Sequence, residues 1–355
     1  MTSSLVGLAL LLTLPAASSA QGYSSATLQG FDSYRSAVIT GSYLKERYGS
    51  VLPEYVALRT DGRASFGRRA QVLEAKILSE LKGHGSLAYA EIYYGDYWTS
   101  KGRSAYVTFD LVDAADAVVR MPFKAAPKGS VADPEGLLAA WDKYQELGRS
   151  LQLSAQLGLE RPSCPAFYCT YGSATPELAA LERKFSSTVP GSVKALLGVL
   201  DNDASPERRS TAMFLLSYLT DGREVVGIAL GALSDPDDGV RGAALQVLSD
   251  VTTYRKDVPV DPLKLYPVLD YPSTSDRSRA LGVLVGLADN PAYEKVFRAS
   301  PPPRILELLK MRQPVIHDTA YAFLVIMTKE SYGRWDHAAW ERWLADPPKP
   351  GKKKR

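Results

Sequence analysis

Residues 233–251, LSDPDDGVRGAALQVLSDV, contain the end of one helix, a short turn and the start of a second helix. Asp and Pro at this turn stop the first helix and begin the next. In the second helix, apolar residues stand at +3, +4 and +7 from Ala244, which is one stripe of an α-helix. These residues are Val247, Leu248 and Val251. The segment therefore predicts two helices joined by a tight turn.

The same pattern occurs four times and aligns without gaps on an alanine. The four alanines are spaced by 32, 36 and 40 residues: Ala212, Ala244, Ala280 and Ala320. Each has Leu at +4, and a shorter amphipathic helix precedes each. Position −3 is Arg in the first three copies and His317 in the fourth. A helix pair repeating at this period cannot bury its own apolar face and must stack on its neighbours.

These helix pairs resemble the HEAT repeat family in its shorter form. The likeness rests on residues 233–244 with Val247 and Leu248, and it extends over residues 189–346, under half of the chain. Turn residues 271–274 and His317 depart from the pattern. Because HEAT arrays mostly serve as protein-binding scaffolds, the resemblance implies an unidentified protein partner. It also implies that Arg209, Arg241 and Arg277 pair with an Asp of a neighbouring turn, Asp235 or Asp270.

The end of the array has its own signals. Trp340 and Trp343 are three residues apart, so both can cover the last repeat as a cap, with an aromatic ligand site as the alternative. Residues 347–355 end in Lys352-Lys-Lys-Arg355 and predict a disordered basic tail.

The first half of the chain predicts a small α+β domain over residues 21–162. A helix, a β-meander and a second helix would form two layers. The expected elements are a partly helical segment 34–54, a helix 65–82, strands 87–98 and 105–112, a third strand 117–123, and a helix from 133 to about 151. The fold class is thus an α+β N-terminal domain followed by an all-α HEAT-like solenoid, mainly α overall.

Residues 1–20 predict a secretory signal peptide. Leu5 to Leu14 is apolar apart from Gly7 and Thr13, and the following residues end small-x-small at Ser18 and Ala20. No Lys or Arg precedes Arg35. The alternative is an uncleaved anchor, but a span needs about 20 apolar residues and this run is shorter. We expect cleavage after Ala20, giving a secreted or periplasmic protein without a membrane span.

Two cysteines stand in a predicted linker, residues 163–188. Four residues lie between Cys164 and Cys169, which allows the short Cα–Cα distance of a disulfide. An exported protein meets an oxidising environment, so we expect a bridge. A metal site is the alternative, but it lacks partners because no His lies between His84 and His317.

Composition and missing motifs restrict the function. The chain has 355 residues, 45% of them hydrophobic, and a net charge of +3, too small for a dedicated nucleic-acid binder. Neither Gly-x-Ser-x-Gly nor His-Glu-x-x-His occurs. Ser42-Tyr-Leu-Lys45 matches the nucleophile motif Ser-x-x-Lys, but the companion motifs Lys-Thr-Gly and Ser-Asp-Asn do not occur. We therefore expect no catalytic residues, no metal and no cofactor, and interpret the protein as a non-enzymatic scaffold.

Candidate binding residues come from two places. Tyr97 and Trp98 belong to an aromatic hairpin, so an N-terminal glycan-binding, peptide-binding or hydrolytic module is the alternative function. On the second helices, positions +2, +5 and +6 include Phe214 and Tyr218 in the first copy and apolar residues in the last two: Gly282, Val285, Gly286, Ala322, Val325 and Ile326. A helix that is apolar all round is normally covered. The N-terminal domain is the preferred cover, a partner or second copy the next, with Phe214 and Tyr218 near the open end of the groove.

Overall fold

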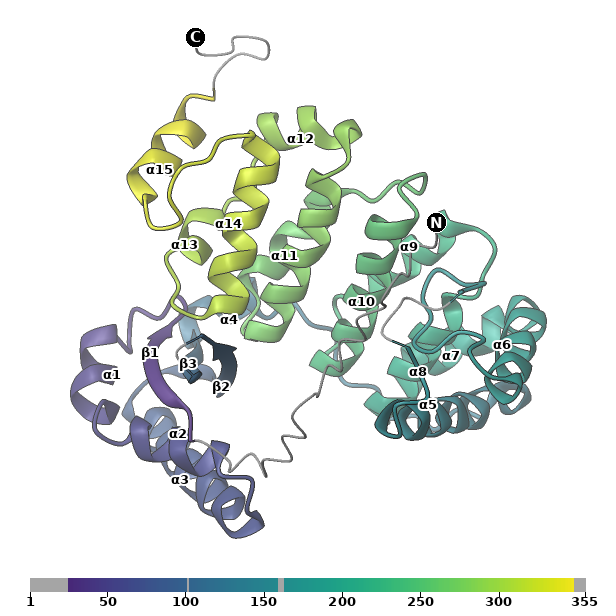
Figure 1. The fold of residues 1–355 in the computed structure, drawn as a ribbon, viewed down its shortest axis with the longest axis horizontal. Helices are drawn as coiled ribbons and strands as arrows, with labels where there is room; N and C mark the ends of the chain where they lie inside the picture. Colours follow the sequence, from purple (N-terminus) through teal and green to yellow (C-terminus); the bar gives the residue numbers. More distant parts are fainter. Residues whose placement is uncertain (1–24, 101, 159–162, 348–355) are drawn as a thin grey trace, which may run out of the picture.

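The computed structural model describes residues 25–100, 102–158 and 163–347. These form a mainly helical molecule with a small three-stranded sheet near the N-terminus (Figure 1). The prediction of a mainly α fold with an α+β N-terminal part is confirmed. The expected signal peptide with its cleavage site, and residues 348–355 of the expected tail, lie outside the described residues.

The sheet is not the expected meander. Strands β2 (Leu87–Thr99) and β3 (Gly102–Asp113) form the predicted antiparallel hairpin, but the third strand is β1 (Thr27–Ser33), which pairs parallel with β3. The segment expected as a third strand contains the short helix α4 (Ala117–Arg120). Val118 and Val119 are both exposed there, whereas a strand would turn one of them inward.

Three helices cover one face of this sheet: α1 (Gly41–Tyr48), α2 (Leu52–Thr60) and α3 (Ala64–His84). Alternate residues of β3 pack with them into one hydrophobic cluster: Ala105, Val107, Phe109 and Leu111. The other residues of β3 point to the opposite face, because side chains alternate along a strand. Thr108 and Asp110 lie on that second face and are buried as well.

The helical array contains four second helices that stack in chain order: α8 (Pro206–Leu216), α10 (Asp238–Tyr254), α11 (Thr274–Ala288) and α14 (Pro314–Thr328). Figure 1 shows α10, α11 and α14 side by side. The leucines at +4 are fully buried in one continuous cluster, as expected: Leu216, Leu248, Leu284 and Leu324.

The first helices become shorter along the array. The first two are α7 (Val193–Asn202) and α9 (Gly222–Ala232), whereas the third is only a 3-10 turn (Tyr266–Asp270) and the fourth is α13 (Ile305–Leu309). An inserted helix, α12 (Glu294–Ala299), accounts for the longest alanine spacing. The last helix, α15 (His337–Ala345), buries Trp340 and Trp343 at the end of the array.

The two helices that follow the sheet in the chain pack with the helical array. Helices α5 (Leu137–Leu153) and α6 (Pro176–Thr188) share its hydrophobic cluster, and the Trp141 ring lies 5.6 Å from that of Phe214. The expected packing of the helix from residue 133 against the sheet is therefore not observed. Residues 121–132 form an extended strap across the repeat turns, where Lys124 N donates to Ser234 O at 2.8 Å and Ala204 N to Gly129 O at 2.7 Å.

Candidate functional site

Buried arginines connect the first three repeats to another element each, and we call Arg209, Arg241 and Arg277 the arginine ladder. Arg209 holds the Asp235 carboxylate through Nε and Nη2 at 2.8 and 2.7 Å, which confirms the expected pair. Arg241 instead pairs with Asp276 at 2.7 Å. Asp270, the other expected partner, pairs with Arg35 and Arg304. Arg241 pairs with Asp276 rather than with an expected Asp because Asp276 lies in the first turn of α11, beside α10.

The Nη1 atoms of the arginine ladder bind the turn preceding each second helix. Arg209 Nη1 donates to the carbonyls of Asp203 and Ala204, six and five residues earlier. Arg241 and Arg277 repeat the contact with their own turns. In the fourth repeat, His317 Nδ1 lies 2.6 Å from the Leu309 carbonyl oxygen. These residues therefore tie each turn to its helix, which is a structural role.

The last arginine of the ladder binds the sheet. Asp110 of β3 accepts hydrogen bonds from Arg277 Nη2 at 2.6 Å and from the backbone and hydroxyl of Thr274 at 2.7 and 2.8 Å. Nearby, Arg312 N donates to Asp32 and Tyr97 OH donates to Gln313 Oε1 at 2.7 Å. The second face of the sheet thus lies against the N-terminal ends of α11 and α14.

This contact differs from the expected cover of the second helices. Val285 and Val325 each lie eleven residues beyond the start of their helices, about 16 Å along the axis. The N-terminal domain therefore does not lie over them. At Gly286, the close neighbour is the adjacent helix α10, because an added Cβ would come within 2.7 Å of Thr252 Oγ1.

Half-exposed residues remain on the outer side of three neighbouring helices, and we call them the second-helix surface. They are Gln246, Ser249 and Asp250 of α10, Gly282, Val285 and Gly286 of α11, and Ala322, Val325 and Ile326 of α14. Val285 and Val325 also touch the core. An added Cβ at Gly282 would meet nothing within 4 Å, so space is open there.

Phe214 and Tyr218 do not line an open groove. Phe214 stacks between Trp141 and Tyr168, with ring centroids 5.6 and 4.8 Å away. Tyr218 is buried and donates to Glu182 Oε2 at 2.7 Å. Helices α5 and α6, with Tyr168 from the segment between them, cover this end of the array, which the helix periodicity of residues 209–219 alone could not indicate.

The aromatic hairpin is divided between two environments. Tyr97 faces the array, and burial raises its pKa to about 12. Trp98 points away and is 72% exposed, with the Arg103 guanidinium 5.8 Å from its ring. The two neighbouring residues therefore do not form one aromatic site, because adjacent side chains of a strand point to opposite faces.

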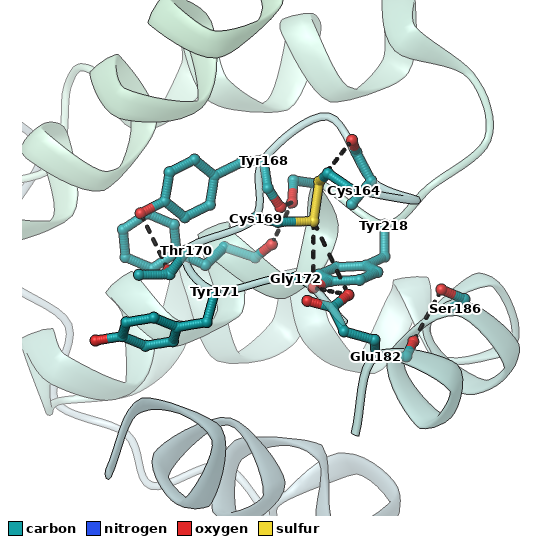
Figure 2. The surroundings of a disulfide bond; sticks show 12 residues. Cys164, Tyr168, Cys169, Thr170, Tyr171, Gly172, Glu182, Ser186 and Tyr218 are labelled. Carbon is teal, nitrogen blue, oxygen red and sulfur yellow. Dashed lines mark hydrogen bonds between the residues drawn. A yellow bond between two sulfur atoms is a disulfide. The ribbon is translucent and has the colours of Figure 1, made fainter. Parts of the chain in front are cut away.

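The predicted disulfide joins Cys164 and Cys169, with a Cα–Cα distance of 5.6 Å. Figure 2 shows Glu182 of α6 and Tyr218 of the array beside it. Burial raises the pKa of the Glu182 carboxyl, which accepts hydrogen bonds from Tyr144 OH and Tyr218 OH, both at 2.7 Å. Glu182 was not among the expected site residues. The sequence feature that could have indicated its burial is its position four residues after Leu178, on the apolar face of α6.

No family model, curated protein or solved structure matches this chain. Within residues 25–100, 102–158 and 163–347, no group of three or more His, Cys, Asp and Glu side chains could hold a metal ion. Nor does any helix in those ranges have the length and apolarity to cross a membrane.

Proposed function

We propose that this protein is an exported, non-enzymatic scaffold whose short HEAT-type repeats bind another protein through the second-helix surface. One observation carries the proposal: half-buried apolar side chains on α11 and α14 continue into the polar residues of α10 across adjacent helices. An exposed apolar surface with a polar border is typical of a protein interface.

The self-contacts of the chain support this choice of surface. The turn edge of the array is already occupied by the strap over the first two repeats and by the sheet over the last two. The arginine ladder holds the repeats in one register from within. The second-helix surface is therefore already ordered before a partner binds, so binding costs little conformational entropy at this surface.

Site-specific photo-crosslinking tests the surface. A photoreactive amino acid at Gln246 or Ala322 should capture one defined protein from the envelope fraction of the producing cell, and one at Glu224, exposed on α9, should not. Ile326→Glu should abolish capture, whereas Val118→Glu at an exposed position of α4 should retain it. Equal capture from all positions would refute the second-helix surface.

Export is part of the same proposal, and it rests on the apolar run and small-residue site of residues 5–20. The exported form should have the mass of residues 21–355 less two hydrogens for the disulfide. Mass spectrometry of the exported protein checks this. A full-length product would contradict cleavage, and two thiols that alkylate without a reductant would contradict the bridge.

The second candidate function is an N-terminal glycan-binding, peptide-binding or hydrolytic module, and the exposure of Trp98 favours it. A ligand stacking on this ring would change its fluorescence. Titration with soluble glycans and peptides should then give a signal that Trp98→Phe removes. Identical titrations for both proteins would eliminate this candidate.

A further inference from the structure

The two sulfurs of the disulfide lie in different environments. Cys164 is half exposed and borders an open cleft of about 920 Å³, with Ser163 and Pro165 beside it. Cys169 is 7% exposed and belongs to the hydrophobic cluster of the array. A nucleophile arriving from solvent would therefore reach Cys164 first.

A buried carboxyl group lies next to the Cys169 sulfur of the same bond. Glu182 Oε2 is 3.9 Å from Cys169 Sγ, and Tyr218 OH lies 3.9 Å from that sulfur and 2.7 Å from Oε2. Tyr144 OH accepts from the backbone N–H groups of Tyr171 and Gly172 and donates its single proton to Oε1. These contacts fix the carboxyl group with Oε2 towards Cys169.

The environment of Glu182 favours its protonated form. The side chain is 1% exposed, and its hydrogen-bond partners are two phenols rather than a cation. Burying a carboxylate without a countercharge is costly, which is why burial raises its pKa. The carboxyl group whose pKa is raised thus has Oε2 at 3.9 Å from the buried sulfur.

We propose that Cys164–Cys169 is a thiol–disulfide exchange site, at which an incoming dithiol attacks Cys164 while Glu182 donates a proton to the departing Cys169 sulfur. This role goes beyond partner binding by the array. It assigns Cys164 as the exchanging sulfur, Cys169 as the leaving group and Glu182 as the general acid.

The exchange balances in two steps. A thiolate of the dithiol attacks Cys164 Sγ, the Cys164–Cys169 bond breaks, and Cys169 leaves with the electron pair and takes the proton of Glu182. The second thiol of the reductant, as a thiolate, then attacks the reductant sulfur that is bonded to Cys164 in the mixed disulfide. This step releases Cys164, which takes a proton from water. The dithiol is oxidised to a disulfide, the protein gains two thiols, and Glu182 regains its proton from water.

The buried position of Cys169 explains why a general acid is needed there. A thiolate leaving into the hydrophobic cluster would be an uncompensated charge in a medium of low polarity. On the open side, Arg183 and Lys184 line the cleft and favour the approach of an anionic thiolate.

The rate of reduction by dithiothreitol tests the proposal. We expect the disulfide of the folded chain to be reduced about tenfold more slowly in Glu182→Gln, whose amide cannot donate the proton. Glu177→Gln, an exposed change in the first turn of the same helix, should match the unchanged protein. Thiols are trapped with a maleimide and counted by mass spectrometry.

A purely structural role of Glu182 predicts the opposite sign. Loosening this cluster would expose the disulfide and make reduction of Glu182→Gln faster, so an unchanged or faster rate overturns the proposal. Single-cysteine variants test the assignment of the sulfurs independently. Cys164 in Cys169→Ser should be alkylated at least about tenfold faster than Cys169 in Cys164→Ser, and equal rates would refute the assignment.

Discussion

At the scale of single residues, buried charges specify how neighbouring repeats meet. Each arginine of the ladder satisfies both a carboxylate and the carbonyls of a turn, so the position at −3 links two elements. Such buried pairs contribute modest net stability, yet losing one partner leaves a charge without compensation.

The Arg209–Asp235 pair makes this argument testable. Asp235→Ala should lower the free energy of unfolding by about 3–5 kcal/mol, because the buried Arg209 guanidinium loses its partner. Asp318→Ala removes the half-exposed pair with Arg334 and should cost less than about 1 kcal/mol. Urea unfolding measures both variants. Equal losses would mean that burial of the pair is not what matters.

His317 predicts a pH dependence. Its ring stacks on Trp335 at 3.8 Å, and burial lowers its pKa below the ordinary 6.5, while Asp318, Arg334 and His337 are the charged or titratable neighbours. The unfolded chain then binds a proton that the folded chain does not, so stability falls as the pH drops below about 6.5. Burial dominates this shift: the contact of Nδ1 with Leu309 O raises the pKa and only partly opposes it, and Nε2 has no hydrogen-bond partner among the described residues.

Replacing the ring should remove that dependence. His317→Asn should show a smaller change in urea midpoint between pH 7.5 and pH 5 than the unchanged protein. His84→Asn, at the exposed end of α3, should keep the original profile. Parallel profiles for all three proteins would assign the acid sensitivity to other groups.

At the scale of elements, the second helices carry the array, because their stripes stay buried even where the first helices shrink to a single turn. Leu248→Ala in α10 should therefore cost about 2–5 kcal/mol of unfolding free energy through lost packing. Val72→Ala, at an exposed position of α3, should change it by less than about 0.5 kcal/mol. Thermal unfolding of the two variants checks the contrast, and a small loss for Leu248→Ala would invalidate the stripe alignment.

At the scale of the whole molecule, the central strand β3 is covered on both faces. Helices α1–α3 cover one side and the ends of α11 and α14 cover the other, with Asp110 at the contact (Figure 1). We therefore expect sheet and array to unfold in a single transition, since each buries a surface of the other.

Asp110→Asn should split that transition into two, because the neutral amide cannot compensate the buried Arg277. Hydrogen exchange of β2 and β3 should then become faster than that of α10. Glu91→Gln changes the exposed residue opposite Asp110 on β2 and should leave one transition. One transition in Asp110→Asn would show that apolar contacts alone couple the two parts.

Local pattern was sufficient for the second helices of the array, the hairpin and the disulfide. The stripe at +3, +4 and +7 predicts the buried leucines because helix periodicity is a property of adjacent turns. The spacing of Cys164 and Cys169 likewise restricts their distance without reference to the rest of the chain.

The tertiary structure alone decided which distant segments meet. The parallel pairing of β1 with β3, the packing of α5 on the array and the choice of Asp110 for Arg277 join residues 73 to 167 positions apart, where no local periodicity exists. The same holds for Glu182 beside Cys169 and Tyr218. A buried charge or phenol takes whichever partner the packed core brings within hydrogen-bond distance, so these contacts follow from burial of the whole chain rather than from any one segment.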